Sequence, residues 1–107
     1  MICTFEENQL LIKPEGKIMM DHSDQIKNEI KSLIQSKKED PNIHLEGVLI
    51  DLSKIDFVDS TGVGVFISLY KFSVEKDFQL TLLNPTPMVD KVFTITKLGQ
   101  IINIQSN

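Results

Sequence analysis

Two short apolar runs, separated by polar residues, stand at the start of the chain. Residues 2–5 and 9–13 each form such a run, and the polar Glu-Glu-Asn between them is typical of a tight turn, which predicts two strands. Pro14 and Gly16 then interrupt the pattern. We expect residues 17–20 to resume the second strand beyond this break.

From Asp21 onward the apolar spacing changes to every third or fourth residue. Ile26, Ile30 and Ile34 recur at the interval that places them on one face of a helix. Asp21 or Ser23 is expected to cap the exposed amides at the start of this helix.

Residues 48–52 are a continuous apolar run interrupted only by an aspartate, which predicts a strand covered on both faces. A second helix is expected after Ser60, with two apolar stripes on roughly opposite sides. The first stripe comprises Val63, Phe66, Ile67, Tyr70 and Val74, and the second comprises Val65, Leu69 and Phe72. The first would face the sheet, whereas the second either packs on neighbouring helices or stays open to a partner protein.

The last third of the chain predicts one more strand and helix, followed by an edge strand. Residues 78–82 alternate as a strand, and Thr86 with Pro87 is a favourable helix start. Gly99 is expected to be the left-handed residue that ends this helix, and residues 101–104 would add the edge strand.

The element order ββαβαβαβ indicates an α/β fold with a mixed central sheet of about five strands, flanked by three to four helices. The 107 residues, of which 41% are hydrophobic and 24% charged, have the composition of a globular protein. We therefore expect one soluble domain over residues 1–107.

The charge of the chain and the absence of targeting signals exclude several classes of function. The net charge is −4, and the eleven basic residues are scattered among fifteen acidic ones, so no nucleic-acid surface is expected. Neither a secretory signal nor a long apolar run is visible, which favours a cytoplasmic protein without a membrane segment. The single cysteine, Cys3, is interpreted as a small apolar residue of the first strand.

The sequence offers little support for catalysis or metal binding. The Gly62-Val63-Gly64 segment lacks the third glycine of a dinucleotide fingerprint, and no GxSxG pattern surrounds Ser60. Asp51, Asp56 and Asp59 could bind a divalent ion, but aspartates in loops more often bond their own backbone. No cofactor and no metal are predicted.

Asp59 and Ser60 stand where the strand connection turns into the second helix, where amides are unpaired and the helix dipole is positive. The simplest interpretation is an N-cap. However, Gly62 and Gly64 would also let another protein's backbone approach. A phosphate on Ser60 would add about −1.5 to −2 charges at this helix start. A partner with an acidic or apolar surface would meet repulsion or a desolvation cost there, while the fold stays unchanged.

The strand of residues 48–52, the block Phe57-Val58-Asp59-Ser60-Thr61-Gly62-Val63-Gly64 and the pair Asn84-Pro85 resemble the STAS domain family, and within it the bacterial anti-sigma factor antagonists. The resemblance extends over the whole chain. It implies partner switching, in which the unphosphorylated protein binds an anti-sigma factor that is also a serine kinase, and so releases the sigma factor. It also implies that phosphorylation of Ser60 blocks binding and that a serine phosphatase reverses it.

The resemblance also implies that the protein is not an enzyme, that its partners bind the ATP and metal, and that it is a monomer when free. It further implies roles for individual residues. The phosphorylated residue would be Ser60, supported by Asp59, Thr61, Gly62 and Asp21. The partner would be contacted by Gly64, Val65, Ser68, Leu69 and Phe72. Where the family commonly has an acid after the second strand this chain has Met19, and Asp21 follows two residues later.

Two other functions remain open at this point. One is nucleotide or small-molecule binding at the end of the sheet that carries Asp51, Asp56, Asp59 and Ser60. The other is a scaffold role without phosphorylation, as in STAS subunits of signalling or lipid-transport complexes. A calorimetric titration with purine nucleotides would separate the first from partner switching.

Overall fold

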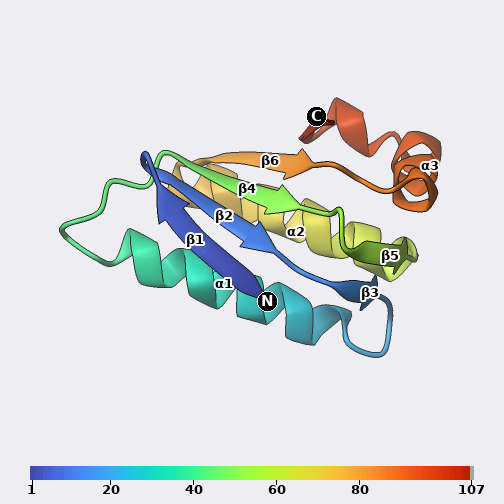
Figure 1. Ribbon diagram of the computed structural model, residues 1–107, viewed down its shortest axis with the longest axis horizontal. Helices are drawn as coiled ribbons and strands as arrows, with labels where there is room; N and C mark the ends of the chain where they lie inside the picture. The colour runs from blue at the N-terminus through green and yellow to red at the C-terminus, as the bar shows by residue number, and fades with distance from the viewer. Residues whose placement is uncertain (107) are drawn as a thin grey trace.

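Five strands form one mixed sheet in the computed structural model, which describes residues 1–106 (Figure 1). They are β1 (Ile2–Glu6), β2 (Gln9–Lys13), β4 (Gly47–Asp51), β6 (Gln79–Leu83) and β7 (Asn103–Gln105). Their order is β1-β2-β4-β6-β7, and β1 is antiparallel to β2 while all other neighbours are parallel. The predicted α/β fold with a mixed sheet is confirmed.

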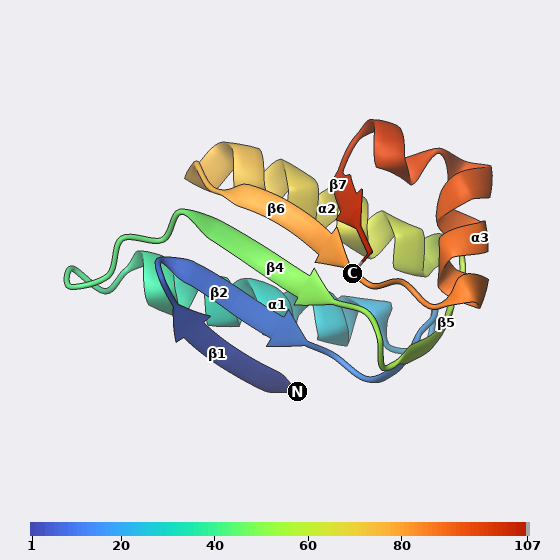
Figure 2. The same ribbon diagram turned by 45° about the horizontal axis from the view of Figure 1, so that its top comes forward.

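The helices α1 (Ser23–Lys38) and α2 (Ser60–Lys76) lie on one face of this sheet, as Figures 1 and 2 both show. The helix α3 (Pro87–Thr96) lies at one end of the molecule, and the short 3-10 helix η1 (Leu98–Gln100) leads into β7. Because no helix of residues 1–106 covers the other face, Leu49 on β4 is only half-buried. The expectation that this strand is covered on both faces is therefore wrong.

A separate two-stranded parallel sheet corrects the sequence-based prediction. β3 (Gly16–Ile18) pairs with β5 (Ile55–Val58), so the residues after Pro14 do not resume β2. Gly16 has a φ of 98°, a left-handed conformation that redirects the chain at this break. β5 was not predicted, because four residues are too few for a clear alternation.

The apolar residues of α2 reach the core on both of its predicted stripes. Phe66 of the first stripe is fully buried and meets the ring of Phe93 edge-on, with the ring centroids 5.6 Å apart. Leu69 of the second stripe is equally buried. Val74, predicted to face the sheet, is 65% exposed, so the first stripe ends before it.

The carboxyl end of α3 differs from the prediction. Lys97, with a φ of 58°, is the left-handed residue that ends the helix, whereas Gly99 belongs to η1. The backbone N–H of Lys97 donates to the carbonyls of Phe93 and Thr94, which satisfies groups at the helix end. Thr86 caps α3 by its backbone position alone, since its hydroxyl donates to the carbonyl of Ile55 at 3.2 Å.

No helix within residues 1–106 is long and apolar enough to span a membrane.

Candidate functional site

The junction between β5 and α2 is organised by the Asp59 side chain. Its Oδ1 accepts hydrogen bonds from the Gly62 backbone N–H at 2.8 Å and from the Thr61 hydroxyl at 2.5 Å. Its Oδ2 accepts from the backbone N–H of Met20 at 3.1 Å. Asp59 is therefore the predicted N-cap, and it also ties the segment after β3 to the start of α2.

These donors lower the pKa of Asp59 from its ordinary value of 3.8. The hydrogen bond from the Thr61 side chain is the largest cause, followed by the one from the Gly62 backbone, while desolvation opposes them. Hydrogen bonds to the charged form favour that form, so Asp59 is a carboxylate at neutral pH.

The lowered pKa of Asp59 predicts a stability contribution that depends on pH. Because the folded-state pKa lies below the unfolded value, this contribution is complete above pH 3.8 and is lost as the pH falls through the folded pKa. We expect Asp59→Asn to be less stable than the wild type at neutral pH, and the difference to shrink in acid. Urea unfolding at a series of pH values measures it, with the exposed Asp56→Asn as the control for losing one charge. A difference that stays constant down to the lowest pH would contradict the assignment.

Ser60 is the first residue of α2, and its side chain is exposed. Within residues 1–106 its hydroxyl has no hydrogen-bond partner, whereas the neighbouring hydroxyl of Thr61 is engaged by Asp59. The first turn of α2 itself contains no acidic residue, and the acid next to it is the N-cap Asp59. Of the two adjacent hydroxyls, Ser60 is thus the one available for reaction with an enzyme or for contact with a ligand.

Gly62 and Gly64 have different surroundings. A Cβ atom on Gly62 would lie 2.4 Å from the carbonyl oxygen of Ile18 and 2.7 Å from Cγ1 of Val58, so this glycine is required by the chain's own packing. The sequence-based suggestion that it admits a partner's backbone is wrong. Gly64 is exposed, and a Cβ there would meet nothing within 4 Å, so this position is open to an approaching molecule.

The second stripe of α2 is mostly covered by the chain itself. Val65 is 3% exposed and Leu69 is fully buried, because α1 packs against α2 on this side. Phe72 is half-buried and stacks edge-on with Phe78. The idea of an open apolar docking stripe is therefore wrong for Val65 and Leu69.

A hollow lies between the starts of α1 and α2, beside Thr61. Its lining comprises Met20, Ser23, Asp24, Lys27, Thr61, Gly64 and Val65. Met20 is 73% exposed at its rim, and Asp24 bonds Lys27 at 3.2 Å. The acid beside this hollow is thus Asp24, which sequence reasoning missed.

Asp21 does not fill the role expected of it. It is exposed, it does not line the hollow, and within the described chain it makes no hydrogen bond or ion pair. Asp21 does not cap α1 either, since His22 occupies that position without a side-chain cap and directs its Nε2 to the carbonyl of Lys17. Asp21 lies in the turn between β3 and α1.

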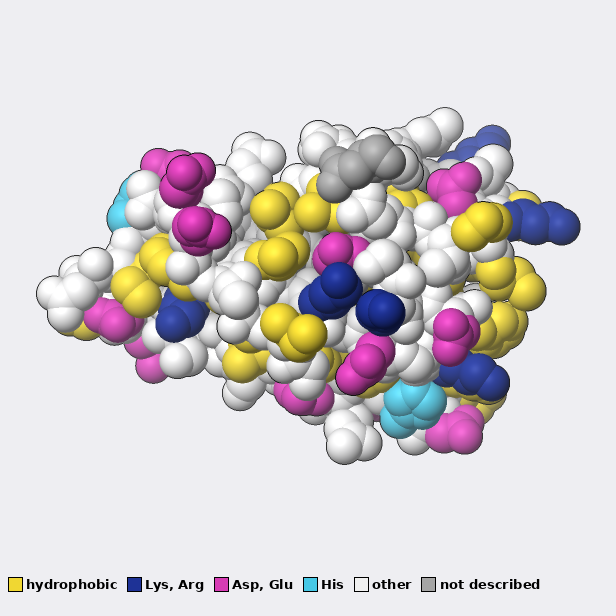
Figure 3. Space-filling model, in the orientation of Figure 1, with side chains coloured by type: hydrophobic (Ala, Val, Ile, Leu, Met, Phe, Trp, Pro, Cys, Tyr) yellow, Lys and Arg dark blue, Asp and Glu magenta, His cyan; other side chains and the backbone are white. Residues whose placement is uncertain are grey.

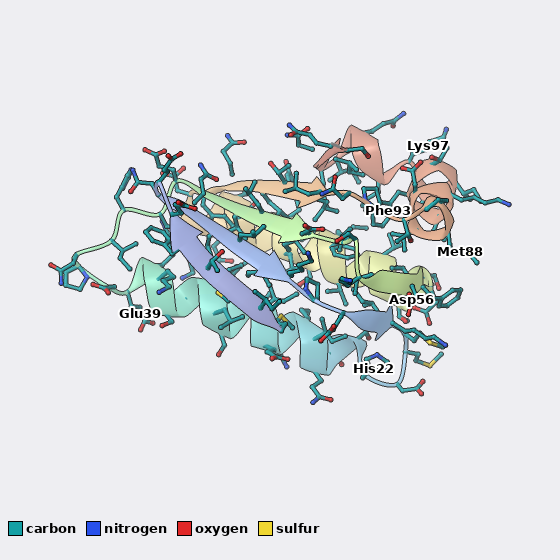
Figure 4. The ribbon with its side chains drawn as sticks, viewed as in Figure 1. His22, Glu39, Asp56, Met88, Phe93 and Lys97 are labelled. Carbon is teal, nitrogen blue, oxygen red and sulfur yellow. The ribbon has the colours of Figure 1, made fainter. Side chains whose placement is uncertain are left out.

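Hydrophobic side chains are visible at the end of the molecule where β5 and the start of α3 lie (Figure 3). Figure 4 shows Asp56 and Met88 at this same end, and Met88 is among the exposed large hydrophobic residues.

The Asp51 side chain accepts a hydrogen bond from the backbone N–H of Ser53, as was expected of the aspartates that follow the strand. No three acidic, histidine or cysteine side chains in residues 1–106 are placed to hold a metal ion.

The family model that matches this chain is the STAS domain, over residues 3–107. The chain belongs to the STAS domain family. Among curated relatives, this STAS domain is 35% identical over 63 residues to an anti-sigma-B factor antagonist of Listeria monocytogenes, a match that covers 57% of the chain and 55% of the relative. The chain thus spans about half the length of that relative.

Two further similarities extend over nearly the whole STAS domain. The chain is 24% identical over 98 residues to an anti-sigma F factor antagonist of Paenibacillus polymyxa, with 92% of the chain and 79% of the relative covered. The solved structure of the anti-sigma factor antagonist SpoIIAA in its unphosphorylated form superposes with a TM-score of 0.72 at 22% identity, with 96% of this chain and 85% of that chain covered. The structural similarity shows that the fold is shared.

Proposed function

We propose that this STAS domain is an anti-sigma factor antagonist whose binding surface is controlled by phosphorylation of Ser60. The observation that carries the proposal is the contrast between two neighbouring hydroxyls. Thr61 is held by Asp59, whereas Ser60 is exposed and unbonded at the start of α2 within the described residues. The similarity to anti-sigma factor antagonists supplies the class of partner.

The partner surface in this proposal is smaller than the sequence alone indicated. It consists of the exposed residues beside Ser60, namely Met20 and Gly64, together with the half-exposed Ser68 one turn further along α2. Methionine adapts to irregular partner surfaces, and Gly64 lets a backbone come close. Ser68 accepts a hydrogen bond from Lys31 Nζ at 3.1 Å, which places a cation at the far end of this surface.

Phosphorylation would act through charge at the edge of this surface. A phosphate on Ser60 carries about −1.5 to −2 charges, which the positive dipole end of α2 can stabilise. A docked partner would meet repulsion and desolvation at the same place. The proposed kinase is the anti-sigma factor itself, a serine phosphatase reverses the modification, and the domain catalyses neither step.

The proposal is tested by incubating the domain with its cognate anti-sigma factor, magnesium and ATP and locating the phosphate by mass spectrometry. We expect one phosphate on Ser60, complete loss of labelling in Ser60→Ala, and unchanged labelling in Ser53→Ala, which alters an exposed serine outside the surface. Phosphate on Thr61, or persistent labelling of Ser60→Ala, would contradict the assignment.

A further inference from the structure

The outer side of β1 is an open sheet edge. β1 is the first strand of the order β1-β2-β4-β6-β7, and within residues 1–106 no strand pairs with its outer side (Figure 2). Its residues 2–5 contain no charge, proline or glycine, and Ile2 is 64% exposed. The opposite edge, β7, has three residues, two of them polar and exposed. Proteins usually protect such edges with charges, prolines or bulges, and β1 has none of these before Glu6.

The hairpin geometry determines which backbone groups of β1 face outward. Glu7 and Asn8 have φ values of 53° and 67°, which indicates a two-residue turn of the I′ type, closed by the pair Glu6 and Gln9. Hydrogen-bonded and non-hydrogen-bonded pairs alternate from there along an antiparallel ladder. Cys3 and Phe5 are consequently the residues that direct their N–H and C=O groups away from β2.

We propose that β1 binds β1 of a second copy of this chain, antiparallel, about a two-fold axis that passes beside Thr4. In this register Cys3 lies opposite Phe5 of the second copy, and each such pair exchanges both backbone hydrogen bonds. Thr4 then faces Thr4 of the second copy as a non-hydrogen-bonded pair, a favourable combination on a sheet surface. The two sheets become one continuous sheet.

Charge complementarity favours a second copy over another extended peptide. One end of β1 is acidic, with Glu6 and Glu7, whereas the other end lies beside Lys13, which is the cross-strand partner of Ile2. The two-fold register places Glu6 of one copy opposite Ile2 of the other copy. Lys13 of that other copy lies beside this Ile2, on the neighbouring strand β2. Each acidic end therefore meets a basic end, and no like charges stand directly opposite one another.

The dimer leaves the phosphorylation site accessible. β1 lies at one margin of the sheet and α2 lies behind the strands toward the other margin, as both ribbon views show. A dimer would present two Ser60 surfaces at once, and the expectation of a monomeric free protein would then have to be revised. This inference does not depend on the proposed function.

Sedimentation equilibrium over a range of protein concentrations tests the dimer. We expect reversible dimers for the wild type and monomers for Thr4→Lys, because two lysines would face each other at the axis while the exposed position tolerates the change in the monomer. The matched control is Gln105→Lys on the opposite edge, which is expected to dimerise like the wild type. A wild type that stays monomeric at every concentration, or equal association of Thr4→Lys, would overturn the proposal.

Disulfide trapping tests the register. In a Cys3→Ala background, Thr4→Cys places two thiols across the axis on residues whose Cα atoms are about 4.5 Å apart, a distance that a disulfide can bridge. The control Glu6→Cys separates the two thiols by about 13 Å along the strands. Under mild oxidation with glutathione disulfide, we expect a covalent dimer only for Thr4→Cys. Equal trapping of both variants, or of neither, would contradict this register.

Discussion

Gly62→Ala is expected to lower the free energy of unfolding by about 1–3 kcal/mol, the usual cost of forcing an extra carbon into packed surroundings. The new methyl group would lie 2.4 Å from the carbonyl oxygen of Ile18, and backbone cannot move aside as easily as a side-chain end. The start of α2 would have to shift away from β3, and the hydrogen bond from the Gly62 N–H to Asp59 would lengthen. Urea unfolding at neutral pH measures this loss.

The matched control for this substitution is Gly64→Ala, two residues further along the same helix. A Cβ at Gly64 meets nothing within 4 Å, and alanine is the better helix former, so we expect stability to rise by up to about 1 kcal/mol. Equal effects of the two substitutions would show that helix propensity, and not contact with β3, governs the start of α2.

Ser60→Asp is expected to weaken binding of the cognate anti-sigma factor by at least about 100-fold, because a charge fixed at the rim of the contact is repelled or desolvated when the partner docks. The same substitution should leave the fold intact. Aspartate in the first turn interacts favourably with the helix dipole, and α2 has no acidic residue there at present. Isothermal titration calorimetry and thermal unfolding measure the two quantities.

Ser32→Asp provides the matched control, since it introduces the same charge at an exposed position of α1. We expect it to bind the anti-sigma factor like the wild type. If both variants lost affinity equally, net charge would explain the effect and Ser60 would have no special role. If Ser60→Asp bound as tightly as the wild type, the proposed control by charge would be wrong.

Elements with long or regular patterns were predictable from the sequence. Ile26, Ile30 and Ile34 predicted α1, and the short apolar runs at residues 2–5 and 9–13, with the polar turn between them, predicted the hairpin that the structure confirms. The sequence predicted an N-cap at Asp59 or Ser60, and the structure shows that Asp59 occupies this position. Local chemistry was sufficient in each of these cases.

Features that depend on distant parts of the chain were missed. The small sheet of β3 and β5 joins segments about forty residues apart, such as Ile18 and Val58, and neither segment is long enough to show a period. The need for glycine at position 62 arises from the Ile18 carbonyl, which no local pattern shows. Likewise, Asp24 and not Asp21 lines the hollow, and no local pattern shows the long-range hydrogen bond from the Met20 N–H to Asp59 beside it.

We propose that a phosphate on Ser60 prevents partner binding while the fold is retained. The most direct measurement compares protein fully phosphorylated at Ser60 with the unphosphorylated form, by calorimetric titration of the anti-sigma factor and by backbone amide NMR spectra of both forms. We expect binding of the unphosphorylated form only, with amide shifts confined to the start of α2 and the neighbouring residues after β3. Binding by both forms, or amide changes spread across the sheet, would contradict it.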